Sequence, residues 1–164
     1  MSRQHIISML LENESGALSR VAGLFSARAY NIESLTVAAT IDPSLSRLTV
    51  VTVGSDMVIE QIKKQLNKLI DVVKLIDLSE SFSLERELVL LKVRKNETIE
   101  QKITELDGDS MARITDETDE FLIVEVSGEK AWLDDFLLSL GDDIIEIVRS
   151  GVIGLSRGER TLTL

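Results

Sequence analysis

Apolar and polar residues alternate along this chain in a way that predicts two successive sets of strands and helices. Runs that are rich in β-branched residues indicate strands, and apolar residues at intervals of three and four indicate amphipathic helices. The first set is predicted in the order strand, helix, strand, strand, helix, strand: 4–12, 16–29, 32–40, 47–53, 57–70 and 72–78. A β-α-β-β-α-β order is typical of a ferredoxin-like sandwich.

The same order recurs after a polar break at 79–83. The second set is predicted at 87–94, 97–106, 111–115, 120–127, 129–140 and 144–149. The chain is therefore predicted to be an α+β protein with two ferredoxin-like βαββαβ sandwiches in tandem. The first domain is expected at 4–78, a linker at 79–84, and the second domain with a glycine-containing tail at 85–164.

The predicted strand 32–40 has the character of an open sheet edge. In this topology the second strand usually lies at an edge, and soluble proteins usually protect edges with charge, proline or bulges. Here the strand carries one charge, Glu33, and no proline. We expect this edge to pair with a second copy of the chain and so form a homodimer. The alternative, in which another part of the same chain covers the edge, stays open.

Charge is distributed unevenly over the 164 residues. The net charge is −10, yet residues 1–78 carry eight basic and eight acidic side chains, so residues 79–164 hold the whole excess. This balance argues against nucleic acid as a partner, because binding to phosphates needs clustered basic charge. The neutral first half is the better place to bind a carboxylate. The alternative, that the acidic excess serves solubility alone, stays open.

The sequence offers little catalytic chemistry. There is no cysteine, and the single histidine, His5, is expected at the surface. Neither a nucleophile–base pattern nor a glycine-rich phosphate loop is visible, so we predict no catalytic residues and no metal ligands. The first apolar run is too short for a signal segment or a membrane span. A cytoplasmic protein with no membrane association is expected.

The loop at 12–18 is the most informative segment. It connects an apolar strand to an amphipathic helix, so Ser15, Gly16, Ala17 and Leu18 form the mouth of that helix. Bare N–H groups at a helix N-terminus attract carboxylates. Gly16 lacks a Cβ and lets the backbone approach a ligand closely. The alternative for Asn13 and Ser15 is simple helix capping.

Several motifs carry a resemblance to a known family. They are Leu10-Leu11-Glu12-Asn13-Glu14-Ser15-Gly16-Ala17-Leu18-Ser19-Arg20, Tyr30-Asn31-Ile32-Glu33-Ser34-Leu35-Thr36-Val37, Ser46-Arg47-Leu48-Thr49 and, near the end, residues 149–158. The chain resembles the small regulatory subunit of acetohydroxyacid synthase (acetolactate synthase) over nearly its whole length, most densely at 6–54. Position 29 departs from the family pattern, because it is alanine where glycine is expected.

The resemblance implies an ACT domain, which binds amino acids, at 4–78. It also implies a separate catalytic large subunit that carries thiamine diphosphate, Mg2+ and FAD, none of which this chain would bind. The small subunit would activate that enzyme and confer feedback inhibition by valine or another branched-chain amino acid. The role of residues 85–164 is not implied by the resemblance.

The effector would lie between two ACT domains. The residues expected to bind it are Asn13, Ser15, Gly16, Ala17, Leu18, Asn31, Ile32 and Ala38. The two asparagine amides would meet the charged groups of the amino acid, and Leu18, Ile32 and Ala38 would line its apolar slot. Asn31 and Ile32 are expected to come from the other subunit. For Asn31, a turn residue with positive φ is the alternative.

Two other functions remain open at this point. One is a free-standing amino-acid-binding ACT protein without an enzyme partner. The other is a small acylphosphatase-like enzyme on the same fold, although Glu12 and Glu14 in the loop after the first strand would repel a phosphate.

Overall fold

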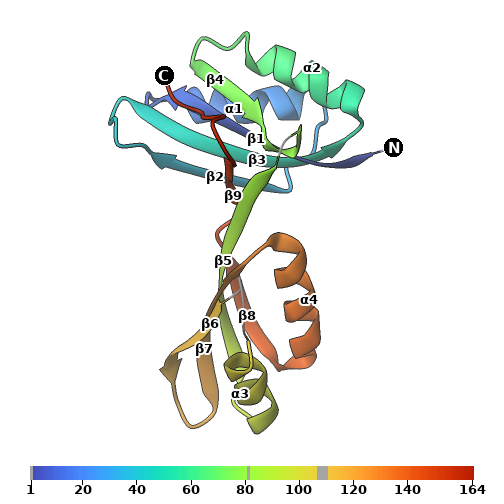
Figure 1. Cartoon of the computed structure of the whole chain (residues 1–164), viewed down its shortest axis with the longest axis vertical. Helices are drawn as coiled ribbons and strands as arrows, with labels where there is room; N and C mark the ends of the chain where they lie inside the picture. Colours follow the sequence, from blue (N-terminus) through green and yellow to red (C-terminus); the bar gives the residue numbers. More distant parts are fainter. Residues whose placement is uncertain (1, 81, 107–110) are drawn as a thin grey trace. The chain divides into compact units, whose positions relative to one another are not determined.

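The chain forms two compact units in the computed structural model, which describes residues 2–80, 82–106 and 111–164 (Figure 1). The first unit comprises residues 1–84 together with 152–164, and the second comprises residues 85–151. Ser81, in the predicted linker, lies outside the described residues. The remainder of that segment includes a short 3-10 helix, η1 (Leu78–Glu80).

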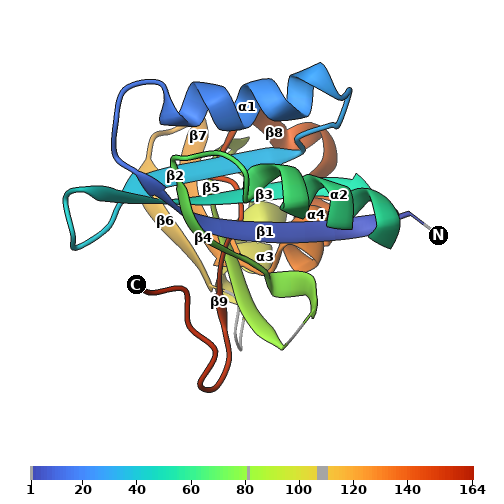
Figure 2. The same ribbon diagram turned by 90° about the horizontal axis from the view of Figure 1, so that it is seen from above.

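The first unit is a four-stranded antiparallel sheet with two helices on one face (Figures 1 and 2). In chain order its elements are β1 (Arg3–Glu12), α1 (Ala17–Ala27), β2 (Ser34–Ala39), β3 (Leu45–Gly54), α2 (Asp56–Leu66) and β4 (Val72–Asp77). The strands lie in the order β2-β3-β1-β4. This arrangement confirms the predicted fold class, and it places β2 at an edge of the sheet.

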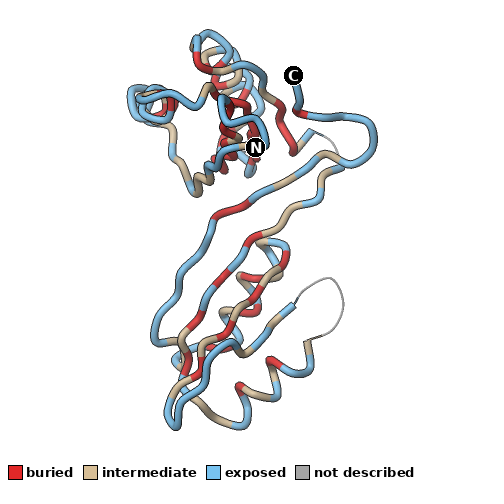
Figure 3. The backbone as a smooth tube through the Cα atoms, turned by 90° about the vertical axis from the view of Figure 1, so that its left-hand side faces the viewer, coloured by how far each residue is buried: buried red, intermediate tan, exposed pale blue. Residues whose placement is uncertain are grey.

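Apolar side chains explain why the helices lie where they do. The helix-side core consists of one face of the sheet and the apolar stripes of both helices, and its most buried members include Ile7, Leu48, Phe25 and Ile62. These side chains are at most 1% exposed. Buried positions alternate with exposed ones along the helices of the tube (Figure 3). The 3.6-residue period of the sequence therefore decides which helical face meets the sheet.

Both helices end before the predicted boundary. The helix α1 stops at Ala27, and Ala29 has a φ of 54°, in the left-handed region that a helix cannot continue through. The helix α2 stops at Leu66, where the chain turns and the N–H of Leu69 donates to the Leu66 carbonyl at 3.0 Å. Ile70, predicted as the last helical residue, is 87% exposed.

The tail that was assigned to the second domain packs in the first unit. Val152 and Leu162 are 1% and 6% exposed, and they join a small core on the sheet face opposite the helices. Strand β9 (Ile153–Ser156) lies within this tail. Beyond it, the Arg157 N–H donates to the carbonyl of Phe82. The domain boundary at 85–164 therefore differs from the observed grouping, because the two apolar anchors find their contacts on the first sheet.

The second unit repeats the topology of the first. Its elements are β5 (Ser83–Arg94), α3 (Glu97–Thr104), β6 (Met111–Glu117), β7 (Phe121–Gly128), α4 (Lys130–Leu140), the 3-10 helix η2 (Gly141–Asp143) and β8 (Ile144–Arg149). The strand order β6-β7-β5-β8 matches that of the first sheet. At its start, α3 is capped by Asn96, whose side chain accepts from the Ile99 N–H.

His5 is buried, so the expectation of a surface histidine is wrong. It is 1% exposed, with Nδ1 3.2 Å from the buried carboxylate of Asp77 and Nε2 3.5 Å from Asp56. Its position near the start of the chain is overridden by strand β1, which carries it into the sheet. Among the described residues, none of the helices combines the length and apolar character that crossing a membrane requires.

Candidate functional site

The helix mouth lies where β1 ends and α1 begins. Gly16 occupies the N-cap position with φ 90° and ψ −11°, a left-handed conformation, and no side chain caps this helix end. Within the described part of the chain, the N–H groups of Leu18 and Ser19 donate to no acceptor. Both residues are exposed. Two free N–H groups at a helix N-terminus form a site that favours a carboxylate.

A cation lies beside this mouth. A Cβ placed on Gly16 would meet Nη1 of Arg20 at 2.9 Å. The other two nitrogens of that guanidinium, Nε and Nη2, each donate to the carboxylate of Asp71 at 2.6 Å. Asp71 is 2% exposed, and its pKa is lowered mainly by the hydrogen bond from Arg20. The bidentate pair therefore fixes Arg20 next to the predicted carboxylate position.

Arg20 was not singled out from the sequence, although one signal pointed to it. A basic residue in the first turn of a helix opposes the helix dipole, which favours anions at that end. Such a residue is expected only where a carboxylate compensates it. Here Asp71 supplies the compensation from the loop between α2 and β4.

Asn13 holds the helix mouth against the loop between β2 and β3. Its Nδ2 donates to the carbonyl of Pro43 at 2.9 Å, and its Oδ1 accepts from the hydroxyl of Ser46 at 3.1 Å. Its backbone N–H donates to the carbonyl of Ser44 at 2.7 Å. Neither Asn13 nor Ser15 caps α1, so the capping alternative is wrong. The amide of Asn13 is engaged within the chain, whereas Ser15 is exposed.

The remaining predicted residues lie along β2 and just before it. Ala38 is exposed near the end of β2, and Asn31 is exposed before the start of that strand. Ile32 packs against the helix-side core. The carbonyl of Asn31 accepts from the hydroxyl of Thr52 at 2.6 Å. Among the described non-glycine residues only Ala29 has a positive φ, so the turn alternative for Asn31 is wrong.

Within one protomer these residues fall into two groups. Ala39, next to Ala38, pairs with Ser46, and Ser46 contacts Asn13, so Ala38 lies at the same end of the sheet as the helix mouth. Asn31 and Ile32 lie at the opposite end of β2. Six residues of strand separate the two ends by roughly 20 Å. One amino acid cannot contact both groups in the same protomer.

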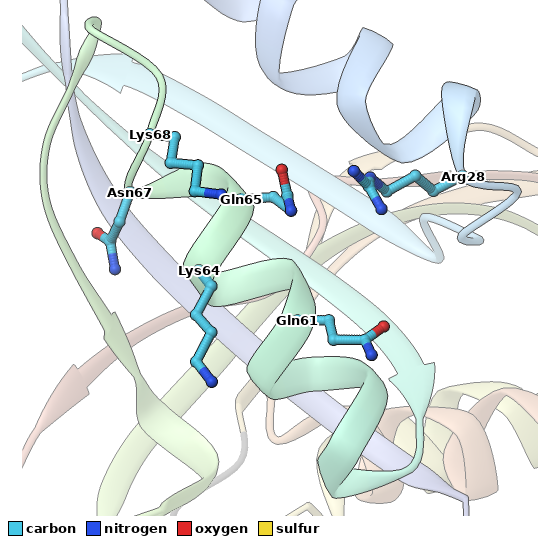
Figure 4. Close-up of a pocket in the computed structure, with 6 residues that line it drawn as sticks. All are labelled: Arg28, Gln61, Lys64, Gln65, Asn67 and Lys68. Carbon is cyan, nitrogen blue, oxygen red and sulfur yellow. The ribbon is translucent and has the colours of Figure 1, made fainter.

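A pocket of about 530 Å3 lies elsewhere in this unit, between the end of α1 and α2 (Figure 4). It is lined by Arg28, Gln61, Lys64, Gln65, Asn67 and Lys68. None of these residues belongs to the predicted effector set. Its basic residues lie at the C-terminal ends of the two helices, where cations are favoured by the helix dipole. The charge of this pocket is therefore explained without a ligand.

In 2–80, 82–106 and 111–164, no group of three or more His, Asp or Glu side chains is arranged to hold a metal ion. The candidate site consists of a helix mouth with free N–H donors, a neighbouring arginine and an exposed sheet edge, and this arrangement suits recognition of a small carboxylate.

Comparison with known proteins gives a consistent result over both units. Residues 7–74 match the family described as AHAS small subunit-like ACT domain, and residues 86–158 match the family described as small subunit of acetolactate synthase. The acetolactate synthase small subunit of Haemophilus influenzae is 50% identical over 97% of this chain and 99% of its own length. The acetolactate synthase isozyme 3 small subunit of Escherichia coli is 48% identical over the same shares.

A solved structure agrees with the fold of the whole chain. The crystal structure of the acetolactate synthase small subunit from Thermotoga maritima superposes with a TM-score of 0.85 at 36% sequence identity. The match covers 96% of this chain and 99% of that one.

Proposed function

The chain belongs to the family of acetolactate synthase small subunits, and from this premise we propose how it regulates that enzyme. It activates a catalytic large subunit and makes the activity sensitive to valine or another branched-chain amino acid. The effector binds at the seam between two ACT units of a homodimer. The observation that carries this proposal is the division of the candidate residues between the two ends of an open edge strand.

The open edge supports a two-fold dimer. Among the described strands β2 pairs with β3 alone, and its last three residues are exposed. When two such edges pair in antiparallel fashion, the beginning of one β2 strand lies next to the end of the other. Asn31 and Ile32 of one protomer then approach Ala38 and the helix mouth of its partner. The two groups that lie about 20 Å apart in a protomer thereby come together at the seam.

The chemistry of the seam suits a free amino acid. The N–H groups of Leu18 and Ser19 and the guanidinium of Arg20 face a carboxylate, while the side-chain carbonyl of Asn31 accepts from an ammonium group. The side chains of Leu18, 39% exposed, and Ile32 supply apolar surface for a branched aliphatic side chain. Discrimination among valine, leucine and isoleucine then depends on differences of about 1–3 kcal/mol for one methylene group.

Regulation requires different effector affinity in two states of the complex. A coupling of about 1–3 kcal/mol changes affinity roughly 5- to 150-fold. We propose that the effector stabilises an ACT dimer that activates the large subunit less well. Thiamine diphosphate, Mg2+ and FAD belong to the large subunit in this proposal, and the whole complex functions in the cytoplasm.

Reconstitution tests the proposal directly. Activity of the large subunit is measured with and without this chain, and the stimulated activity is titrated with valine, leucine and isoleucine. The expected results are stimulation by the chain and inhibition by at least one of the three. Calorimetry and sedimentation on the isolated chain are expected to show saturable binding and a dimer. Stimulation without any binding of a branched-chain amino acid would refute the effector site and keep the activating role.

A further inference from the structure

The C-terminal strap, defined as residues 152–164, covers the face of the first sheet that lies opposite the helices. Val152 and Leu162 are the buried anchors of the strap. They pack against apolar side chains that point away from α1 and α2: Ile6, Leu10, Val51, Ile76 and Leu78. Outside these two anchors most of the strap is exposed. Its seating therefore depends on a small number of specific contacts.

Two basic side chains of the sheet hold the backbone of the strap. Nη2 of Arg47 donates to the carbonyl of Gly154 at 2.9 Å, and Nζ of Lys74 donates to the carbonyl of Thr163 at 2.7 Å. Nε of Arg47 also donates to the hydroxyl of Ser8 at 3.0 Å. Among the described residues, neither cation lies within 4 Å of a carboxylate. Neutral oxygens alone stabilise the partly buried charge of Arg47.

Partial burial destabilises the charged form of Arg47. Removal of water lowers the pKa of its guanidinium. Burial of a polar group destabilises the folded state unless the group keeps its hydrogen bonds. Displacement of the strap would remove the bond to Gly154 and change the surroundings of the charge. The position of the guanidinium and the position of the strap are therefore linked.

Arg47 also adjoins the edge that forms the proposed effector seam. In the pairing of β2 with β3, Arg47 lies directly opposite Ala38, and the next pair is Ala39 with Ser46. Directly opposed residues in an antiparallel pair point to the same face, with Cβ atoms about 5 Å apart. Ser46 contacts Asn13 at the helix mouth. Displacement of β2 would therefore change the position of Arg47 through Ala38, and displacement of the helix mouth would do so through Asn13 and Ser46.

We propose that Arg47 is a positioning residue that couples the effector-binding edge of the ACT unit to the C-terminal strap, so that the seating of the strap is part of the allosteric response. This inference rests on the proposed function, because it concerns the response to the same effector. Arg47 does not contact the effector. It transmits a change at β2 to Gly154.

Hydrogen–deuterium exchange on the full chain tests the coupling without any substitution. Exchange of peptides from 152–164 is compared with and without saturating valine in the dimer. The expected result is a change of about twofold or more in the strap, in either direction. If valine binds and the exchange of the strap is unaltered, the coupling is refuted.

Variants of Arg47 separate coupling from simple packing. Arg47→Met keeps most of the side-chain volume and removes the bond to Gly154, whereas Arg47→Lys restores a cation. Lys64→Met, on the helical face, is the matched control for loss of one positive charge. We expect Arg47→Met to raise exchange of the strap about fivefold and to shift half-inhibition by valine about fivefold, with partial rescue in Arg47→Lys and no shift in the control.

The outcomes distinguish this inference from the proposed function. If no branched-chain amino acid inhibits the activity of the wild-type complex, the proposed function and the coupling are refuted together. Sensitive wild type with an unaltered half-inhibition in Arg47→Met, despite a loosened strap, would refute the coupling alone. Unaltered exchange in that variant would show that Arg47 does not hold the strap. Circular dichroism and the midpoint of thermal unfolding establish that each variant is folded.

Discussion

Two substitutions of Gly16 separate its effect on stability, through the left-handed backbone at the helix mouth, from its effect on effector binding. In Gly16→Ala, an L-residue is forced to a φ of 90°, which costs about 1–2 kcal/mol. The new Cβ lies 2.9 Å from Nη1 of Arg20. Since Asp71 holds that guanidinium, its displacement costs about 0.5–1.5 kcal/mol more. A less flexible unfolded chain returns about 0.4–1 kcal/mol. The three terms together predict a loss of unfolding free energy of about 0.5–3 kcal/mol, centred near 2 kcal/mol.

Gly16→Asp is expected to behave differently. Aspartate tolerates the left-handed region better than alanine does, and its carboxylate lies near the free N–H groups of the mouth and near Arg20. We therefore expect a smaller loss of stability than in Gly16→Ala. The new carboxylate occupies or repels the position of the effector carboxylate, so the Kd for valine should rise at least about tenfold, equivalent to about 1.4 kcal/mol.

Urea denaturation and calorimetry measure the two effects on the same preparations. Gly23→Ala is the matched control, because Gly23 lies within α1 with ordinary φ and open space around it. It should gain about 0.5–1 kcal/mol of stability and bind valine normally. Valine affinity in Gly16→Asp equal to that of wild type would refute the placement of the carboxylate at the helix mouth. A Gly16→Ala variant as stable as wild type would refute the strain argument.

Three further predictions concern the same unit. Ala29→Gly should relieve a left-handed φ of 54° and raise the unfolding free energy by up to about 1 kcal/mol in urea denaturation, after the entropy cost of glycine. The pKa of Asp71 is lowered by Arg20 in the folded protein. The ionised carboxylate therefore contributes its full stabilisation above the unfolded pKa near 4, and this stabilisation is lost as pH falls through the folded pKa. The wild-type protein should consequently lose more unfolding free energy than Asp71→Asn between about pH 5 and pH 3. Equal losses in the two proteins, measured by urea denaturation at each pH, would contradict this prediction. Val37→Lys adds charge to the exposed edge β2 and should convert the proposed dimer to monomers in sedimentation at micromolar concentration. A variant that stays dimeric would place the interface elsewhere.

Local patterns in the sequence determined the order and type of strands β1 to β8 and of helices α1 to α4. Strand 144–149 was predicted with the boundaries that the structure has, and the helical stripes identified the faces that pack on each sheet. These features depend on side chains within a few residues of one another, so periodicity reports them directly. The edge position of β2 also followed from the β-α-β-β-α-β order, because that order admits few topologies.

Tertiary structure alone decided which distant residues meet. Only in the folded chain do Val152 and Leu162 pack on the first sheet and does His5 lie buried beside Asp77. In the same way, only folding lets the side-chain amide of Asn13 donate to the loop between β2 and β3. Each of these contacts joins residues more than 25 positions apart in the chain, and no local pattern encodes such a pairing. The sequence alone determined that this chain has a helix mouth suited to a carboxylate. The separation of the remaining candidate residues by the length of β2 is a property of the sheet, and it is the physical reason why the site that we propose needs a second protomer.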